Sequence, residues 1–178
     1  SLAGLRVAWM PRCGNRLLDG EVEAATLRAV QRMEAEGAVV ETVEIDFVAL
    51  ERHFLVMLES GIAARVQPHV ARFRDHLDPH LLETVEMGLR HSAISLQEAG
   101  AARSAAFRAV QDILARCDVI VSPVLTAPPP PLDWRLPDGP ILVEGEESGT
   151  IRGGMYPYTF PYNLTGHPAL AMPCGSTR

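Results

Sequence analysis

The sequence has no lysine: all 16 of its basic side chains are arginine. It also has no two adjacent serines. Lysine is among the commonest residues of globular proteins, so its complete absence is informative. Chemistry that uses a lysine amine as a base, or two neighbouring serines as nucleophile and relay, is therefore excluded from these 178 residues.

Cysteine and long apolar runs are also scarce. The only cysteines are Cys13, Cys117 and Cys174, an odd number, far apart and without a Cys-x-x-Cys pair. This excludes a disulfide framework or a zinc ribbon and suits a reducing compartment. No apolar run reaches the roughly 18 residues of a membrane span, and no signal peptide precedes the first predicted strand. We therefore expect a cytoplasmic protein without a membrane partner.

Charge and composition indicate an ordinary globular chain. The net charge of −6 and the scattered arginines argue against a nucleic-acid-binding face. With 47% hydrophobic and 21% charged residues in 178, the chain can bury a sizeable core. We expect one domain over residues 1–178.

The first quarter of the chain predicts a βαβ unit. Residues 5–9 are typical of a strand that stops at Pro11, and apolar residues then recur at helical spacing from about Gly20 to Gly37. Residues 38–45 alternate as a second strand does. A strand, a helix and a strand within about 40 residues favour a parallel pair with a right-handed crossover.

The middle of the chain predicts helices and one buried strand. Helices are expected over residues 47–66, 81–90 and 95–117, followed by the apolar run 118–123, typical of a strand buried on both faces. Residues 124–155 then read as a long loop that is rich in proline and acidic residues. Loops of this length in compact domains are usually functional or disordered.

The helix at 95–117 carries the strongest candidate from physical reasoning alone. Arg103 falls on the same stripe as small apolar residues such as Ala99 and Ala106. A buried guanidinium needs a partner, because an unpaired buried ion costs several kcal/mol. We therefore predict a buried, hydrogen-bonded Arg103, in an internal salt bridge or in a substrate pocket, with an exposed kink as the third possibility.

Two other patterns are weaker. His76 and His80 have the spacing of a helical metal site, but Pro79 interrupts the helix that this spacing requires, so we expect no metal. No cofactor is expected either. Cys174 lacks an accompanying histidine–acid pair beyond His167, which favours a buried thiol over a nucleophile.

The last quarter is the most specific part of the sequence. Residues 156–175, YPYTFPYNLTGHPALAMPCG, predict a short aromatic helix, a turn at Gly166 and a small buried strand at 169–172. This run closely resembles the C-terminal segment of amidase signature hydrolases, which carry the pattern Asn-x-Thr-Gly-x-Pro-Ala-x-x-x-Pro-x-Gly. The matching motif residues are Asn163, Gly166, Pro168, Pro173 and Gly175, and the Pro123 turn matches a second family pattern.

The resemblance implies an α/β fold, a mixed sheet with helices on its faces, as in the C-terminal part of the amidase signature architecture. That family hydrolyses C–N amide bonds through a serine acyl-enzyme, using a Ser–cis-Ser–Lys triad that this sequence lacks. No catalytic residue is therefore assigned. We expect a C-terminal portion that contributes pocket walls and scaffold and is inactive alone.

The resemblance also implies which residues and partners matter. It places Arg103 on a helix that reaches the substrate in glutamine-using members, and Thr126 after a Ser/Thr-Pro-Thr turn beside the active site, although Val124 and Leu125 intervene here. For Tyr156 and Phe160 two interpretations stay open: they pack in the core or cover the missing half, or they line an acyl or amide pocket. The expected partners are the missing N-terminal catalytic half, a small amide substrate and, through exposed apolar surface, further copies of the chain.

Two alternatives remain open from the sequence. One is a free-standing regulatory or binding domain in which Arg103 and the aromatic residues hold a small carboxylate. The other is part of a glutamyl-tRNA amidotransferase A-type subunit. Glutamine-specific members tend to carry an acidic residue near Tyr156, where this sequence has Met155.

Overall fold

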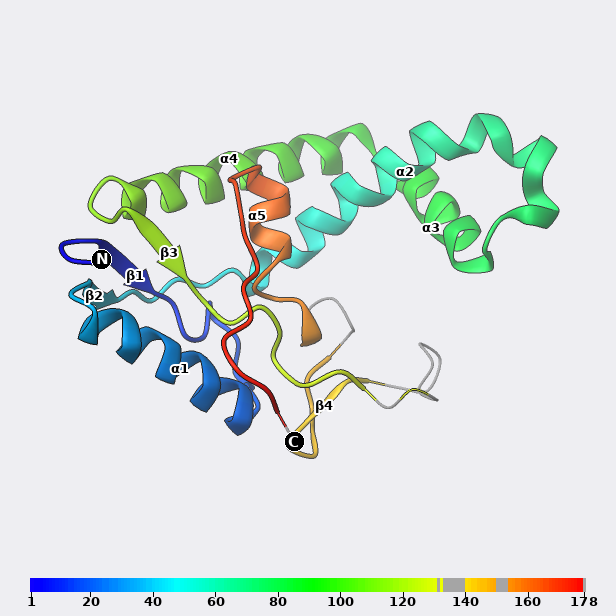
Figure 1. The fold of residues 1–178 in the computed structure, drawn as a ribbon. Helices are drawn as coiled ribbons and strands as arrows, with labels where there is room; N and C mark the ends of the chain where they lie inside the picture. Colours follow the sequence, from blue (N-terminus) through cyan, green and yellow to red (C-terminus); the bar gives the residue numbers. More distant parts are fainter. Residues whose placement is uncertain (131, 133–139, 150–153, 178) are drawn as a thin grey trace. The chain divides into compact units, whose positions relative to one another are not determined.

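The computed structural model describes residues 1–130, 132, 140–149 and 154–177. The chain divides into two compact units. The first comprises Ser1–Val48 together with Ala106–Arg178, and the second comprises Ala49–Ala105. The secondary structure is shown in Figure 1, and each unit is described by itself below.

A three-stranded parallel sheet forms the centre of the first unit. Strands β1 (Arg6–Trp9), β2 (Val39–Thr42) and β3 (Val119–Val121) are arranged in the order β2-β1-β3. Both pairs are parallel, and helix α1 (Gly20–Ala35) connects β1 to β2. The predicted βαβ unit and the α/β class are therefore confirmed.

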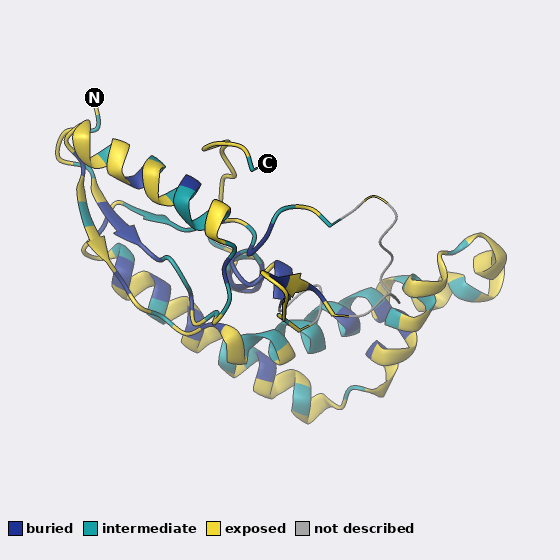
Figure 2. Cartoon of the chain, turned by 90° about the horizontal axis from the view of Figure 1, so that it is seen from below, coloured by how far each residue is buried: buried dark blue, intermediate teal, exposed yellow. Residues whose placement is uncertain are grey.

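Helices cover both faces of this sheet. Helix α1 lies on one face, and the C-terminal part of α4 (Ala93–Leu114) lies on the other (Figure 1). The central strand β1 is the most deeply buried element between them (Figure 2). The buried residues of β1 and of the two helices in this unit are Val7, Ala8, Ala25, Val30, Ala106, Val110 and Ile113.

The start of α1 is set by local side-chain chemistry. Asp19 is the N-cap, and its Oδ1 accepts hydrogen bonds from the backbone N–H groups of Glu21 (2.9 Å) and Val22 (3.1 Å). Two acidic residues in the first turn also favour the positive end of the helix dipole. The helix ends just before Gly37, whose φ of 98° a residue with a side chain rarely adopts.

Strand β3 differs from its prediction. The apolar run 118–123 predicts a strand buried on both faces, but all three residues of β3 are only partly buried. The reason lies in the sheet order, because among the described strands β3 has only β1 as a neighbour. An apolar run does not by itself reveal whether the sheet continues beyond it.

The second unit consists mainly of two packed helices. It contains α2 (Glu51–Phe73), α3 (Pro79–Arg90) and the first part of α4, with the short 3₁₀ turns η1 (Val48–Leu50) and η2 (Arg74–His76) before and after α2. Helix α2 runs through Pro68 beyond the predicted end at residue 66. A proline inside a helix removes one backbone donor and crowds the preceding turn, which is why the sequence predicts an end that the helix does not have.

Close packing holds α2 and α3 together. Gly88 lies against the Glu59 backbone, and Glu59 Oε2 is 2.6 Å from His91 Nε2 at the end of α3. Pro79 occupies the first turn of α3 after the Asp78 N-cap, so His76 and His80 lie in different helical elements. No helix among the described residues is both long enough and apolar enough to cross a membrane.

The predicted loop at 124–155 contains a short β-hairpin. Strands β4 (Leu142–Val143) and β5 (Glu146–Glu147) pair antiparallel around Glu144 and Gly145, which adopt φ values of 51° and 84°. This geometry is that of a tight hairpin turn. Residues 131, 133–139 and 150–153 of this stretch lie outside the described residues.

The C-terminal segment only partly follows its prediction. The short aromatic helix is present as α5 (Phe160–Thr165), and Gly166 ends it in the left-handed conformation with φ 80°. Residues 169–172, however, form no strand and are exposed. Cys174 is exposed as well, so the predicted buried strand and buried thiol are both wrong. A strand exists only with a pairing partner, and no described segment pairs with this one.

Candidate functional site

The candidate site lies where the parallel strands β1 and β3 end. From β1 the chain crosses to β2 on one side, whereas β3 lies on the other side of β1. Open parallel sheets place their ligands at the carboxyl ends of strands where the direction of connection reverses in this way. The segments that leave this edge are residues 10–19 after β1 and 122–130 after β3.

Aromatic side chains from the segment before and within α5 are buried in this unit. Tyr158 is 2% exposed, and its hydroxyl donates a 2.9 Å hydrogen bond to the carbonyl oxygen of Pro11, just after β1. Phe160 and Leu164 are also buried. Tyr162 packs edge-on against Phe47, with ring centroids 6.4 Å apart. These residues therefore connect α5 to the first unit's core and to the loop after β1.

Two polar groups in this cluster are deeply shielded. The Cys13 thiol is buried, and its burial raises its pKa to about 12, so it is a neutral thiol and a poor nucleophile at neutral pH. Burial likewise raises the pKa of Tyr162. Among the described side chains, the Tyr162 hydroxyl is the buried polar atom that lacks a hydrogen-bond partner.

Thr126 is a structural connector in this structure. It is fully buried, and its hydroxyl donates to the carbonyl oxygen of Gly154 at 2.5 Å. Its backbone N–H donates to Met155 O at 3.2 Å, and its carbonyl accepts from Asp19 N at 2.8 Å. Thr126 thus joins the loop after β3 to the start of α1 and to the residues just before Tyr156.

The two predicted aromatic pocket residues differ in accessibility. Tyr156 is 36% exposed, whereas Phe160 is 3% exposed and belongs to the core. The Tyr156 carbonyl accepts from the Thr159 N–H and hydroxyl, both at 3.1 Å, which fixes the turn into α5. Tyr156 is therefore the aromatic side chain of this pair that a ligand can reach directly.

Arg103 differs from its prediction. It is exposed, not buried, and it belongs to the unit Ala49–Ala105. The buried stripe of α4 does pass through Ala99 and Ala106. At 100° per residue Arg103 lies about 40° from Ala99 and about 60° from Ala106 around the helix, and a long side chain at such a position extends to solvent. The argument that a buried guanidinium needs a partner therefore does not apply here.

The residues of the family pattern are also divided between buried and exposed positions. Pro123 is fully buried after β3. Asn163 and Gly166 are exposed on α5 and at its end, and Pro168, Pro173 and Gly175 lie in the exposed C-terminal segment. Most residues of the family pattern are therefore exposed, and no described part of the chain covers them.

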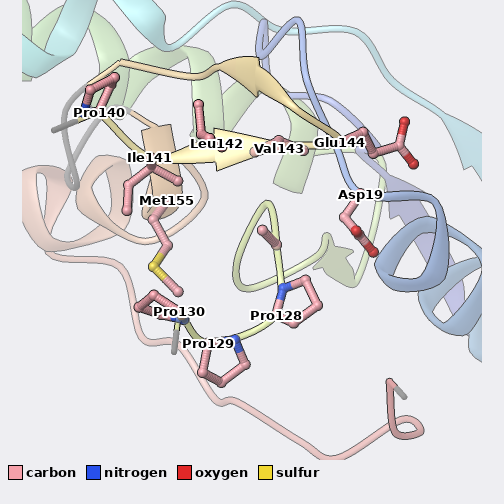
Figure 3. Close-up of a pocket in the computed structure, with 11 residues that line it drawn as sticks. Asp19, Pro128, Pro129, Pro130, Pro140, Ile141, Leu142, Val143, Glu144 and Met155 are labelled. Carbon is pink, nitrogen blue, oxygen red and sulfur yellow. The ribbon is translucent and has the colours of Figure 1, made fainter. Parts of the chain in front are cut away.

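A cavity of about 390 Å³ lies between the β4–β5 hairpin and residues 127–130, and the sequence did not reveal it (Figure 3). Strand β4 forms one wall, the prolines at 128–130 form the opposite wall, and Met155 lies between them. Among the described residues that line it, Asp19 and Glu144 are the charged ones. Both carboxylates already accept backbone N–H groups at the start of α1, Glu144 from Gly20 at 2.9 Å. A hairpin signal at Glu144-Gly145 is the sequence feature that would have indicated this wall.

A family model described as Amidase matches residues 1–178. Among known proteins, the acylamidase of Rhodococcus erythropolis is 28% identical to this chain over 178 residues, which is 98% of the chain but 36% of that protein.

Solved structures show the same fold. A bacterial aryl acylamidase of the amidase signature enzymes superimposes with a TM-score of 0.81 at 19% identity, covering 99% of this chain and 38% of that one. A 6-aminohexanoate cyclic dimer hydrolase superimposes with a TM-score of 0.70 at 18% identity, covering 92% of this chain and 37% of that one. This chain therefore spans little more than a third of the length of these relatives.

Proposed function

Because this chain belongs to the amidase family, we propose that it is the scaffold and substrate-pocket portion of an amidase that hydrolyses a C–N amide bond. In this proposal it is the C-terminal portion of that enzyme, it acts with a catalytic portion that supplies the serine nucleophile and its base, and it is inactive alone. The observation that carries the proposal is the family match over residues 1–178 in a sequence without lysine or adjacent serines.

The reaction class explains why such a portion has no activity of its own. A serine hydroxyl adds to the amide carbonyl, the amine leaves after accepting a proton, and water then hydrolyses the acyl-enzyme. Addition requires a base for the hydroxyl and N–H donors for the developing oxyanion. This sequence lacks the serine pair and the lysine, and its buried Cys13 thiol is held neutral by its raised pKa.

What this portion contributes is a preformed wall. Thr126 fixes the loop after β3 against residues 154–155, and Tyr158 fixes the loop after β1 through Pro11. Tyr156 is left accessible at this edge. We assign Tyr156 to the substrate side of the wall, with Thr126 and Phe160 as residues that position it, and we keep the exposed Arg103 as a further substrate-binding candidate.

The names of the relatives suggest a substrate class, an acyl amide with an aromatic or aliphatic amine.

The absence of an acidic residue beside Tyr156 weighs against the glutamyl-tRNA amidotransferase alternative. The binding-domain alternative relies on Arg103 acting with the aromatic residues, but two of the aromatics are buried. Three unpaired cysteines fit the cytoplasm as the place of action.

The first test is activity of the isolated chain. We expect no hydrolysis of a chromogenic acyl anilide and no labelling by a serine-directed fluorophosphonate, because nucleophile and base are both absent. Turnover that is lost on labelling would contradict the proposal and identify an unrecognised nucleophile.

The second test restores the missing portion. Residues 1–178 replace the matching region of the Rhodococcus erythropolis acylamidase, and anilide hydrolysis by this chimera is compared with that of the same chimera lacking its catalytic serine. We expect hydrolysis that depends on the serine. A folded chimera no faster than its serine variant would show that this chain does not complete an amidase site.

A further inference from the structure

The cavity between the β4–β5 hairpin and residues 127–130 has the size and lining of a small-molecule site. Its volume of about 390 Å³ lies within the range of about 300–1,000 Å³ that such sites occupy. Nine of the eleven described residues that line it are apolar. A molecule bound here would therefore place an apolar body in this space.

The apolar walls of the cavity are preformed. Ala127, Ile141, Val143 and Met155 belong to one buried hydrophobic cluster, in which Val143 is 1% exposed. The opposite wall, residues 128–130, consists of prolines, whose backbone φ is fixed by the ring. The Met155 side chain lies between the two walls (Figure 3). Walls that are already ordered lower the entropic cost of binding.

Two carboxylates, those of Asp19 and Glu144, lie on the same side of the cavity (Figure 3). One oxygen of each is held by the start of α1: Asp19 Oδ1 accepts two backbone N–H groups, and Glu144 Oε1 accepts the Gly20 N–H at 2.9 Å. Asp19 Oδ2 and Glu144 Oε2 accept no hydrogen bond from any described residue. Each carboxylate can therefore still accept an N–H from a ligand.

This lining favours an organic cation over other ligands. No basic side chain is among the described lining residues, so an anion would meet two negative charges without a donor. Metal ions require at least three or four ligands, and no cluster of three or more metal-binding side chains exists among the described residues. An uncharged apolar molecule would contact the walls but gain nothing from the two carboxylates.

We propose that this cavity binds a primary ammonium ion on a small aromatic or aliphatic body, such as benzylammonium. The apolar body lies between Met155 and the prolines, and the ammonium group donates to a free oxygen of Asp19 or Glu144. Such charge-assisted hydrogen bonds are stronger than neutral ones. An alkyl amine is protonated at neutral pH, as the lysine amine is. The inference goes beyond the proposed function and does not depend on it, although amide hydrolysis releases molecules of this class.

Methionine methyl signals in NMR test this proposal on the whole chain. Met155 is one of six methionines, and it is the one among the described lining residues. In protein labelled with ¹³C at the methionine methyl groups, benzylamine at pH 7 should shift the Met155 signal in a saturable way and leave the other five in place. The variant Met155→Leu identifies the signal. Benzyl alcohol has the same ring without the charge, so it should need at least about three times the concentration for half-saturation.

Substitutions that remove one charge provide the second measurement. Asp19→Asn and Glu144→Gln keep the shape of the side chain and an oxygen that accepts the N–H groups of α1. Each should raise the half-saturating concentration of benzylamine about two- to fivefold, the effect of one exposed ion pair, and leave that of benzyl alcohol unchanged. Glu147→Gln is the matched control, because it removes the same charge from the same hairpin without lining the cavity. It should change neither concentration.

Several results would overturn the inference. A Met155 signal that does not shift, or that shifts no more than those of the other methionines, would show that the cavity binds no amine. Equal half-saturating concentrations for benzylamine and benzyl alcohol would exclude recognition of the charge. Binding of N-benzylacetamide as tight as that of benzylamine would assign the cavity to the uncharged amide. Equal effects of Glu147→Gln and Glu144→Gln would trace the binding to net charge. None of these measurements involves hydrolysis, so they succeed or fail independently of the proposed function.

Discussion

At the scale of single residues, two tyrosines of the same cluster have opposite hydrogen-bonding states. The Tyr158 hydroxyl donates to Pro11 O, whereas the Tyr162 hydroxyl is buried without a partner among the described residues. A buried polar group without a partner costs about 1–3 kcal/mol, while a typical satisfied hydrogen bond contributes about 0.5–1.5 kcal/mol. The two hydroxyls should therefore respond differently to removal.

We predict that Tyr162→Phe leaves the free energy of unfolding unchanged or raises it by up to about 2 kcal/mol, because it removes an unpaired buried group. Tyr158→Phe should lower it by about 1 kcal/mol, because the Pro11 carbonyl loses its donor. Urea unfolding of the two variants beside the wild type makes the comparison. Equal losses in both variants would show that Tyr162 has a partner after all, such as an ordered water.

At the scale of elements, the α2–α3 pair depends on a position where only glycine fits. A Cβ at Gly88 would lie 2.2 Å from Glu59 O and 2.7 Å from the Ala63 Cβ. Backbone cannot move aside as a flexible side chain does, so the helices would have to separate. We predict that Gly88→Ala lowers the free energy of unfolding by about 1–3 kcal/mol.

A matched glycine on α2 provides the control for this prediction. A Cβ at Gly61 would have no described atom within 4 Å, so Gly61→Ala adds helix propensity without a clash. It should stabilise the protein by up to about 1 kcal/mol. Thermal unfolding followed by circular dichroism measures both variants. A loss of stability in Gly61→Ala as large as that in Gly88→Ala would show that close packing is not the cause.

The ion pair between Arg6 and Asp118 joins β1 to the start of β3 and makes the stability of the sheet depend on pH. Arg6 donates to Asp118 from its backbone N–H, its Nε and its Nη2, the last at 2.6 Å. The side-chain hydrogen bond from Arg6, helped by the backbone one, lowers the pKa of Asp118 from 3.8 to about 2. A lowered carboxyl pKa stabilises the fold above the unfolded-state value, and this contribution is lost as the pH falls toward 2.

We therefore predict that Asp118→Asn is less stable than the wild type at neutral pH and that the difference shrinks between pH 4 and pH 2. Both side chains are substantially exposed, so the effect is modest and decreases with added salt. Melting temperatures at several pH values, at low and high salt, measure it. A difference that is constant from pH 7 to pH 2 would exclude protonation of Asp118 as its origin.

At the scale of the whole molecule, apolar surface remains uncovered in both units. Leu170 and Met172 are exposed in the first unit, and Leu89 and Ile94 are exposed in the second. Surfaces of this kind favour association when their usual cover is absent. We propose that the isolated chain hides part of this surface by contact with further copies.

We predict concentration-dependent sedimentation of the isolated chain at low micromolar concentration. Leu170→Asp together with Met172→Asp should weaken this association, because the charges remove one apolar face, whereas Ser176→Asp should not. Sedimentation velocity compares the three proteins. A wild-type chain that stays monomeric and binds no hydrophobic dye would show that the exposed surface needs no cover.

The sequence by itself determined which stretches are helical, though not where α2 ends, together with the βαβ start and the family. Helix α1 follows from the Asp19 cap, the helical spacing of apolar residues and Gly37, and all of these act within a few residues of one another. The motif at 163–175 indicated the amidase family that the match over residues 1–178 shows. Local hydrogen bonds and local periodicity are enough for such conclusions, because they do not depend on distant segments.

The tertiary structure decided burial, strand pairing and the state of each candidate residue. Arg103 is exposed although it lies beside a buried stripe, and Thr126 is buried and donates its hydroxyl to Gly154 O. The run at 169–172 reads as a buried strand, yet no described segment pairs with it, so it remains exposed. Burial and pairing depend on which remote elements come into contact, and a sequence pattern records the need for a partner without supplying one.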